Sequence, residues 1–62
     1  MVDYRLYCLD GAGKISLAAD LEAEDDAEAI AIAREKHRHA RKCEIWQRNR
    51  LVATLDARDL AD

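Results

Sequence analysis

The sequence predicts a small α+β domain in which four mainly antiparallel strands form one sheet and a single helix packs on one face. Three observations predict this fold. Residues 3–9 and 14–20 alternate apolar and polar side chains with the two-residue period of a strand. Residues 25–39 are rich in good helix formers. Two further apolar runs, residues 42–47 and 50–55, flank a polar turn, so the element order is β-β-α-β-β.

The first hairpin is expected to join its two strands through the turn Asp-Gly-Ala-Gly at residues 10–13. Its two glycines can adopt the positive φ angles that tight turns often require. A four-residue loop places Cys8 opposite Ile15, and the apolar sets of both strands then fall on one face. The same register pairs two further sets of residues: Leu6 with Leu17, and Tyr4 with Ala19.

The helix is expected to begin at Asp25, because Asp25 followed by Glu28 resembles a capping box. Acidic residues in its first turn and basic residues near its end both suit the helix dipole. One stripe along the helix holds mostly small side chains, so the helix can lie close to a sheet. The stripe consists of Ala23, Ala27, Ile30, Ala33 and His37.

The second hairpin is expected to turn at Arg48 and Asn49, because asparagine tolerates positive φ. This two-residue turn places Trp46 opposite Leu51. A three-residue loop is the alternative, and it would place Leu51 with Ile45 instead. The preferred register also pairs Gln47 with Arg50, and Ile45 with Val52.

The sheet order is expected to be 2-1-3-4, with the first and third strands as the central pair. Pairing the first strand with the fourth in parallel is the alternative, and it gives the order 2-1-4-3. The tail at residues 56–62 can add a helical turn or stay frayed, and Leu60 is its only large apolar residue.

A lone helix can cover one face of such a sheet, so alternation divides the strand residues into two sets. The helix-covered face is expected to hold Tyr4, Leu6, Cys8, Ile15, Leu17, Cys43, Ile45 and Val52. The opposite face is expected to hold Arg5, Tyr7, Leu9, Ser16, Ala18, Glu44, Trp46, Leu51 and Ala53.

The face opposite the helix carries more large apolar side chains than a solvated sheet face should. We therefore expect a protein to cover it, and stacking of two copies about a two-fold axis is the commonest arrangement. Tryptophan and tyrosine are favoured anchors in such interfaces. The expected interface residues are Arg5, Tyr7, Leu9, Trp46 and Leu51.

The composition predicts one soluble domain over residues 1–62 without a membrane span. Half of the residues are apolar, 37% are charged, and no proline or low-complexity linker interrupts the chain. No apolar run approaches the roughly 20 residues of a transmembrane helix, and no signal peptide is recognisable. We therefore expect a cytoplasmic protein. So small a core usually needs a staple or a partner, which favours association.

Nucleic-acid binding is the alternative function. Aromatic residues on an open sheet can stack unpaired bases, and Trp46 and Tyr7 could do so beside basic side chains. The net charge of −3 opposes a polyanionic ligand, which makes this hypothesis the weaker one. The basic residues between positions 34 and 50 are Arg34, Lys36, Arg38, Arg41, Lys42, Arg48 and Arg50.

No catalytic, metal-binding or cofactor-binding residues are predicted. His37 and His39 point about 200° apart on a helix, so they cannot share a metal ion with Cys43 unless the helix has ended. Ser16 is the only serine and lies in a strand, where no histidine–acid pair accompanies it. A redox pair of Cys8 and Cys43 is conceivable if the first and third strands pair, but two buried thiols are favoured.

Three runs of the chain form a recognisable pattern: YRLYCLDGAGKI, DDAEAIAIARE and CEIWQRNRLVATL. Together they resemble a group of short alphaproteobacterial proteins of unknown function. This sequence departs from that pattern at His37, where an apolar residue is more usual, and in having two cysteines. The resemblance implies a β-β-α-β-β fold in a bacterial cytosol, and it implies no activity.

Overall fold

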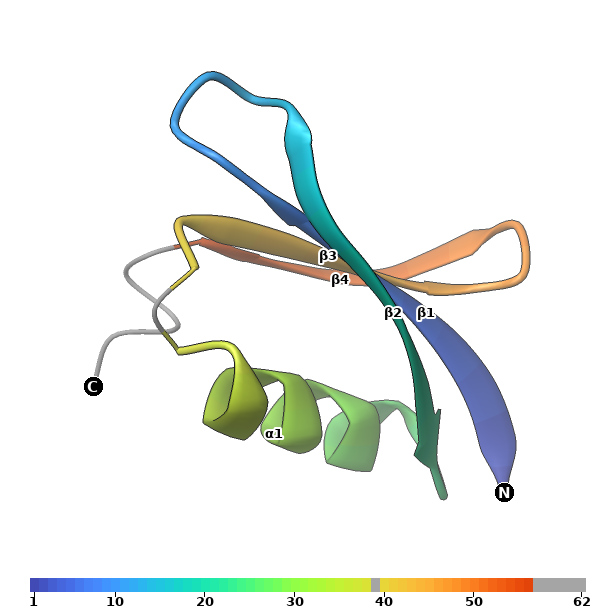
Figure 1. Ribbon diagram of the computed structural model, residues 1–62. Coiled ribbons are helices and arrows are strands. Elements are labelled where there is room, and N and C mark those ends of the chain that lie inside the picture. The colour runs from blue at the N-terminus through green and yellow to red at the C-terminus, as the bar shows by residue number, and fades with distance from the viewer. Residues whose placement is uncertain (39, 57–62) are drawn as a thin grey trace.

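The computed structural model describes residues 1–38 and 40–56 and has the β-β-α-β-β order (Figure 1). Its elements are β1 (Val2–Leu9), β2 (Ile15–Ala23), α1 (Asp26–Lys36), β3 (Lys42–Gln47) and β4 (Arg50–Asp56). The bounds expected for β3 are confirmed, whereas β2 continues three residues beyond its expected end. His39 and the tail after residue 56, including Leu60, lie outside the described residues.

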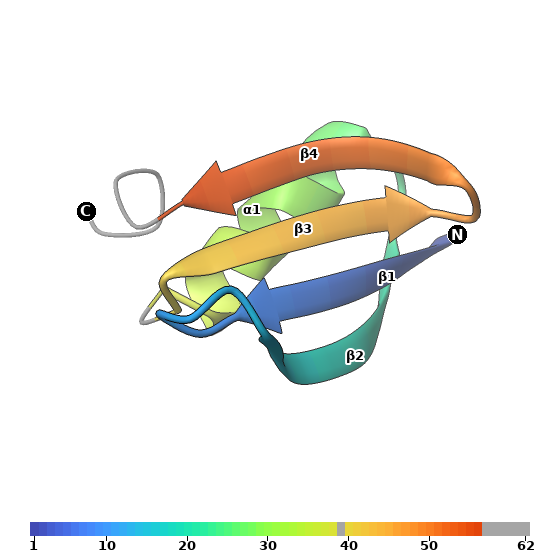
Figure 2. The same ribbon diagram turned by 90° about the horizontal axis from the view of Figure 1, so that it is seen from above.

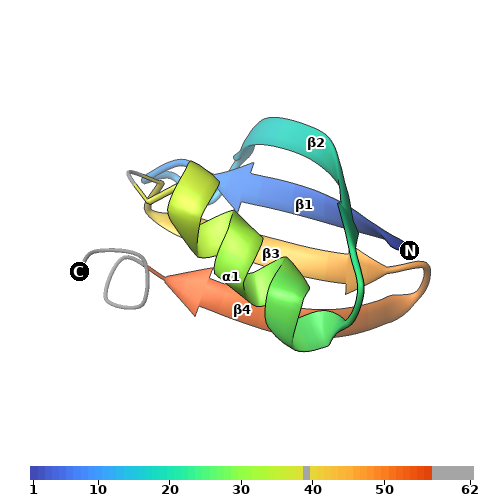
Figure 3. The ribbon, with the colours of Figure 1, turned by 90° about the horizontal axis from the view of Figure 1, so that it is seen from below.

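The four strands form one antiparallel sheet in the order β2-β1-β3-β4. The expected central pair of β1 and β3 is therefore confirmed, and the alternative order 2-1-4-3 is wrong. Figure 2 shows the strands side by side with α1 behind them. Seen from below, α1 crosses β3 and β4, while much of β2 curves away from the helix (Figure 3). One face of the sheet is thus covered by a helix and the other is open.

The turn of the first hairpin is held by Asp10. Its carboxylate accepts hydrogen bonds from the backbone N–H groups of Ala12 and Lys14, at 2.9 and 3.0 Å. The N–H of Asp10 in turn donates to the carbonyl of Lys14 at 2.8 Å. Gly13 has a φ of 84°, which only glycine adopts readily. Five residues separate the last pair, Leu9 and Ile15, so the loop is one residue longer than expected.

The register expected for the first hairpin is wrong by two residues over most of its length. A β-bulge between Cys8 and Leu9 pairs Cys8 with Leu17 and Leu9 with Ile15. Because paired residues share a face, Ile15 lies with Leu9 on the open face and not under the helix. Beyond the bulge, Leu6 pairs with Ala19, and Tyr4 pairs with Leu21.

The second hairpin has the expected two-residue turn, and Trp46 pairs with Leu51 as predicted. The positive φ falls on Arg48, at 58°, rather than on Asn49. A bulge then shifts the register, so that Ile45 pairs with Ala53 instead of Val52. The remaining pairs are Gln47 with Arg50, Glu44 with Thr54, and Cys43 with Leu55.

The second bulge moves Ala53 from the open face to the helix side, which corrects its predicted place. Both Val52 and Ala53 pack against the core, and Leu55 is buried in it. The sequence pattern missed Leu55 because strict alternation from Leu51 places that residue on the opposite face.

The helix begins as expected. Asp25 is its N-cap and accepts a hydrogen bond from the N–H of Glu28, while the Glu28 carboxylate accepts one from the N–H of Glu24. It ends at Lys36, three residues before the expected end. The N–H of His37 donates to Ala33, and the chain then turns towards β3.

The apolar stripe of the helix is centred on Ala29 and Ala33, which are both buried, with Ile30 half-buried beside them. Ala27, which was expected in the stripe, is exposed. The helix is rotated because Asp26, one residue earlier, turns inward and accepts a hydrogen bond from Tyr4. Alanine at the contact allows a close approach between helix and sheet.

The core lies between α1 and the covered face of the sheet. Leu17 was expected there, but it is 39% exposed because α1 does not extend over the start of β2. The buried apolar residues are Tyr4, Leu6, Cys8, Leu21, Ala23, Ala29, Ala33, Cys43, Ile45 and Leu55.

Candidate interaction surface

The face of the sheet opposite α1, called the open face below, is organised in rows of paired residues. One row crosses all four strands and consists of Asp20, Arg5, Trp46 and Leu51. The next row consists of Ala18, Tyr7, Glu44 and Thr54. The third consists of Ile15, Leu9, Lys42 and Asp56. All five residues expected in an interface therefore lie on this face, within three adjacent rows.

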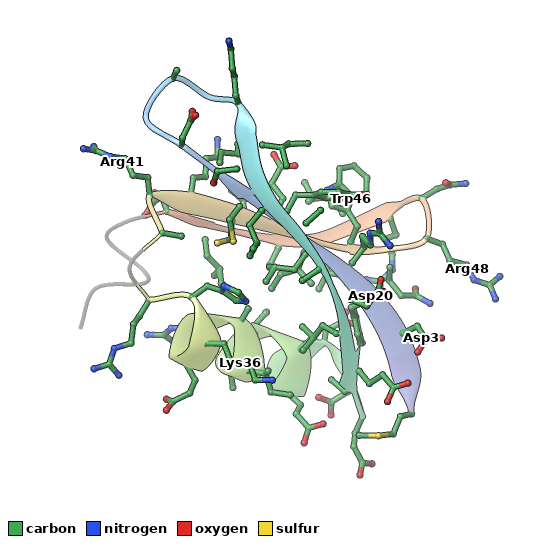
Figure 4. All side chains as sticks on the ribbon, in the orientation of Figure 1. Asp3, Asp20, Lys36, Arg41, Trp46 and Arg48 are labelled. Atoms are coloured by element: carbon green, nitrogen blue, oxygen red, sulfur yellow. The ribbon has the colours of Figure 1, made fainter. Side chains whose placement is uncertain are left out.

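Trp46 lies on the side of the sheet away from the helix (Figure 4). Its indole N–H donates to a Glu44 carboxylate oxygen at 3.2 Å, and its ring is half-buried. Its row neighbours are Arg5 on β1 and Leu51 on β4. The polar edge of the indole is thus satisfied within the chain, and part of the apolar ring is left accessible.

Arg5 joins the charged and aromatic parts of the open face. Its guanidinium forms a 2.8 Å ion pair with Asp20 and lies 5.9 Å from the centroid of the Tyr7 ring, within the range of a cation–π contact. The hydrogen bond with Asp20 is the main reason that the pKa of Arg5 is raised. The positive charge of Arg5 is therefore already compensated within the chain.

Apolar side chains spread along the open face and are incompletely covered. Leu51 is 46% exposed and Ile15 is 61% exposed, while Tyr7, Leu9 and Trp46 are half-buried. Sequence reasoning missed Ile15, because a bulge cannot be read from alternation. The one local signal is Ser16, whose hydroxyl donates to the Cys8 carbonyl at 3.2 Å beside that bulge.

The charges of the open face are separated along the strands. At one end Asp3 pairs directly with Glu22, next to the row that contains Asp20. At the other end lies Lys42, with Arg41 packed beside the Gly11 backbone of the first turn. Figure 4 shows Asp3 and Arg41 at opposite ends of the molecule. The open face is thus acidic where Asp3 pairs with Glu22, whereas at the other end Lys42 is paired with Asp56 and the two charges balance.

The basic residues of the nucleic-acid hypothesis do not gather beside Trp46. Arg50 is held by a bidentate contact with Asp26, at 3.0 and 3.1 Å, and this hydrogen bonding raises the pKa of Arg50. Lys36 lies on the helix, across the sheet from Trp46, and Arg48 projects outward from the second turn (Figure 4). Of that set, Lys42 lies on the open face.

The described residues considered for metal or redox chemistry lie at the end of α1 and on the central strands β1 and β3. His37 caps the C-terminus of α1 and is half-buried. Cys8 and Cys43 are paired directly across β1 and β3, and both are buried free thiols. Over residues 1–38 and 40–56, no group of three or more His, Cys, Asp or Glu side chains could hold a metal ion.

A shallow hollow lies along the outer edge of β2. It is lined by Asp3, Asp20, Leu21, Glu22, Ile32 and Lys36. Asp20 is engaged by Arg5, and the lining contains neither a histidine nor a thiol. The charged side chains of this lining are thus three acids and one lysine.

Comparison with protein-family models, curated proteins and solved structures found no match to this chain. The resemblance to the alphaproteobacterial group stays a prediction. In the part of the chain that the structure describes, no helix is long and apolar enough to cross a membrane. What the fold and its surface define is a small α+β domain with one helix-covered face and one open, partly apolar face.

Proposed function

We propose that the protein is a non-enzymatic interaction module that forms a homodimer through its open face. The observation that supports this best is the row in which half-buried Trp46 lies beside exposed Leu51 on the uncovered side of the sheet. Tyr7, Leu9 and Ile15 extend the apolar surface over the two neighbouring rows. Removing such side chains from water stabilises a complex by roughly 25 cal/mol per Å² of apolar area.

The charge distribution allows a second copy of the chain to be the partner. A two-fold axis between the stacked sheets, perpendicular to the strands, reverses the strand direction of one copy relative to the other. The acidic end around Asp3 and Glu22 then lies away from the acidic end of the other copy and towards the end at which Lys42 is paired with Asp56. This arrangement is self-complementary, as a two-fold interface must be.

The size of the chain agrees with this assembly. A standard interface buries about 800 Å² on each partner, which is close to a fifth of the 4413 Å² accessible surface of this chain. On so small a chain, an interface of that area has to occupy most of one face of the sheet. The dimer would also add a second apolar layer to a domain whose own core is thin.

We further propose that the protein acts in the cytoplasm. Support comes from the composition, since half of the residues are apolar and 37% are charged, as in globular proteins of an aqueous compartment.

The proposal is tested by measuring solution mass over a concentration series. We expect the wild-type chain to shift from monomer to dimer as its concentration rises. Trp46→Glu and Leu51→Glu should both stay monomeric while circular dichroism shows an unchanged fold. Ala31→Glu is the matched control, because Ala31 is exposed on the helix and away from the open face. A wild-type chain that is monomeric throughout the series would overturn the proposal.

The same samples test the nucleic-acid alternative. Single-stranded oligonucleotides at low salt should not bind the wild-type chain. If they do bind, and if binding weakens steeply with salt and on Arg48→Ala, the alternative replaces the homodimer proposal.

A further inference from the structure

We propose that Cys8 and Cys43 form a modification site, at which a small disulfide such as oxidised glutathione converts the two thiols into a bond between β1 and β3. The two residues are directly opposite each other in the antiparallel register. They are 2% and 0% exposed and lie on the helix side of the sheet. The chain has two cysteines among its 62 residues, and the two are thus paired with each other across the central strands β1 and β3.

The backbone geometry suits a disulfide. Directly opposed residues of antiparallel strands have Cα atoms about 4.5 or 5.5 Å apart, depending on whether the pair is hydrogen-bonded. Protein disulfides have Cα separations of about 4.4 to 6.8 Å, so either kind of pair lies within the permitted range. The bond can therefore form without sliding one strand along the other.

The position of the pair gives an oxidant a route to it. Leu9 and Lys42 form the next pair, and it is the last that β1 and β3 share. The thiols thus lie one pair from the end of this ladder, where local opening costs less than global unfolding. Burial, and next the neighbouring Cys8 thiol, raise the pKa of Cys43 to about 12, so the closed sheet keeps the Cys43 thiol unreactive.

The reaction balances with one molecule of oxidised glutathione. A thiolate from one cysteine attacks the glutathione disulfide, forming a mixed disulfide and releasing one glutathione thiolate, which takes up a proton. The second cysteine thiolate then attacks the protein sulfur of that mixed disulfide and releases a second glutathione. The two protein thiols lose two hydrogen atoms in total, and the glutathione disulfide is reduced to two thiols.

The product would link the two halves of the sheet. Among the described strands, β1 pairs with β2, β3 pairs with β4, and the β1–β3 ladder joins these two hairpins. A covalent bond across that ladder closes a loop between residues 8 and 43 and restricts the unfolded chain. The bond lies on the helix side, so it leaves the open face unchanged and does not depend on the proposed dimer.

The test is to incubate the native chain with oxidised glutathione, then unfold it, alkylate the free thiols and measure the intact mass. The main product should have lost two hydrogen atoms and carry no alkyl group. Its Tm should exceed that of the reduced chain by about 10 °C or more. Chain oxidised while unfolded in urea should instead give mostly glutathione adducts, because the two thiols are then far apart.

Three variants control the experiment. Cys8→Ala and Cys43→Ala should each lose the oxidation-dependent rise in Tm. Trp46→Glu should form the same internal bond, which separates failure of this proposal from failure of the dimer. Native chain that retains two alkylatable thiols, or carries glutathione on them without closing the internal bond, would overturn the proposal.

Discussion

Tyr4 on β1 donates a 2.8 Å hydrogen bond to the carboxylate of Asp26, the first residue of α1. The same carboxylate accepts hydrogen bonds from both terminal nitrogens of Arg50 on β4. One acidic side chain therefore ties the start of the helix to a central strand and to an edge strand. This network sets the rotation of the helix over the sheet and accounts for the inward position of Asp26.

We predict that Asp26→Ala lowers the Tm more than Tyr4→Phe does. Asp26→Ala leaves the buried Tyr4 hydroxyl without its acceptor and releases Arg50, whereas Tyr4→Phe removes one hydrogen bond and leaves the Arg50 contact intact. Thermal unfolding followed by circular dichroism measures both. Glu35→Ala, an exposed acid on the same helix, should leave the Tm nearly unchanged.

We predict that the stabilising contribution of the Asp26 carboxylate is lost in acid. Hydrogen bonds from Arg50 and then from Tyr4 lower the pKa of Asp26 below its ordinary value of 3.8. A lowered pKa in the folded state means that the contribution is complete above pH 3.8 and is lost as pH falls through the folded-state pKa. Urea unfolding at successive pH values measures this. The difference in stability between wild type and Asp26→Asn should be constant near neutral pH and shrink below about pH 4; a difference that grows in acid would contradict the sign.

We predict that Ala33→Leu destabilises the fold by about 1–3 kcal/mol, because its side chain would be forced into the helix–sheet contact. Ala33 is 1% exposed. Ala31→Leu introduces the same side chain on the exposed side of the helix and should change the free energy of unfolding by less than about 0.5 kcal/mol. Denaturant titration compares the two; equal effects would show that the helix is rotated differently.

We predict that Arg48→Gly stabilises the second hairpin by about 0.5–1 kcal/mol. Arg48 has a φ of 58°, a conformation that costs a residue with a Cβ atom but not glycine. Asn49 is outside the positive-φ region, so Asn49→Gly should be neutral or destabilising. Urea titrations of both variants decide the point, and the opposite ranking would place the strain on Asn49.

Much of the fold could be predicted because its signals are local. The alternation in residues 3–9, the cap at Asp25 and the two-residue turn before Arg50 each arise within a few residues of the chain, and each is confirmed. Two of the errors in the sheet have the same physical origin. Two β-bulges insert a residue that alternation cannot reveal, and they misplaced Ile15 and Ala53.

The candidate interaction surface was also predicted only in part. The predicted two-residue turn placed Trp46 opposite Leu51. Alternation placed both on the face away from the helix, because a pleated strand must point neighbouring side chains to opposite sides. Only the tertiary structure aligned these residues with Arg5 and Asp20 in one row, since strand order and register depend on contacts between distant segments. It also decided that Arg50 is bound to Asp26, 24 residues away, and that Cys8 lies opposite Cys43.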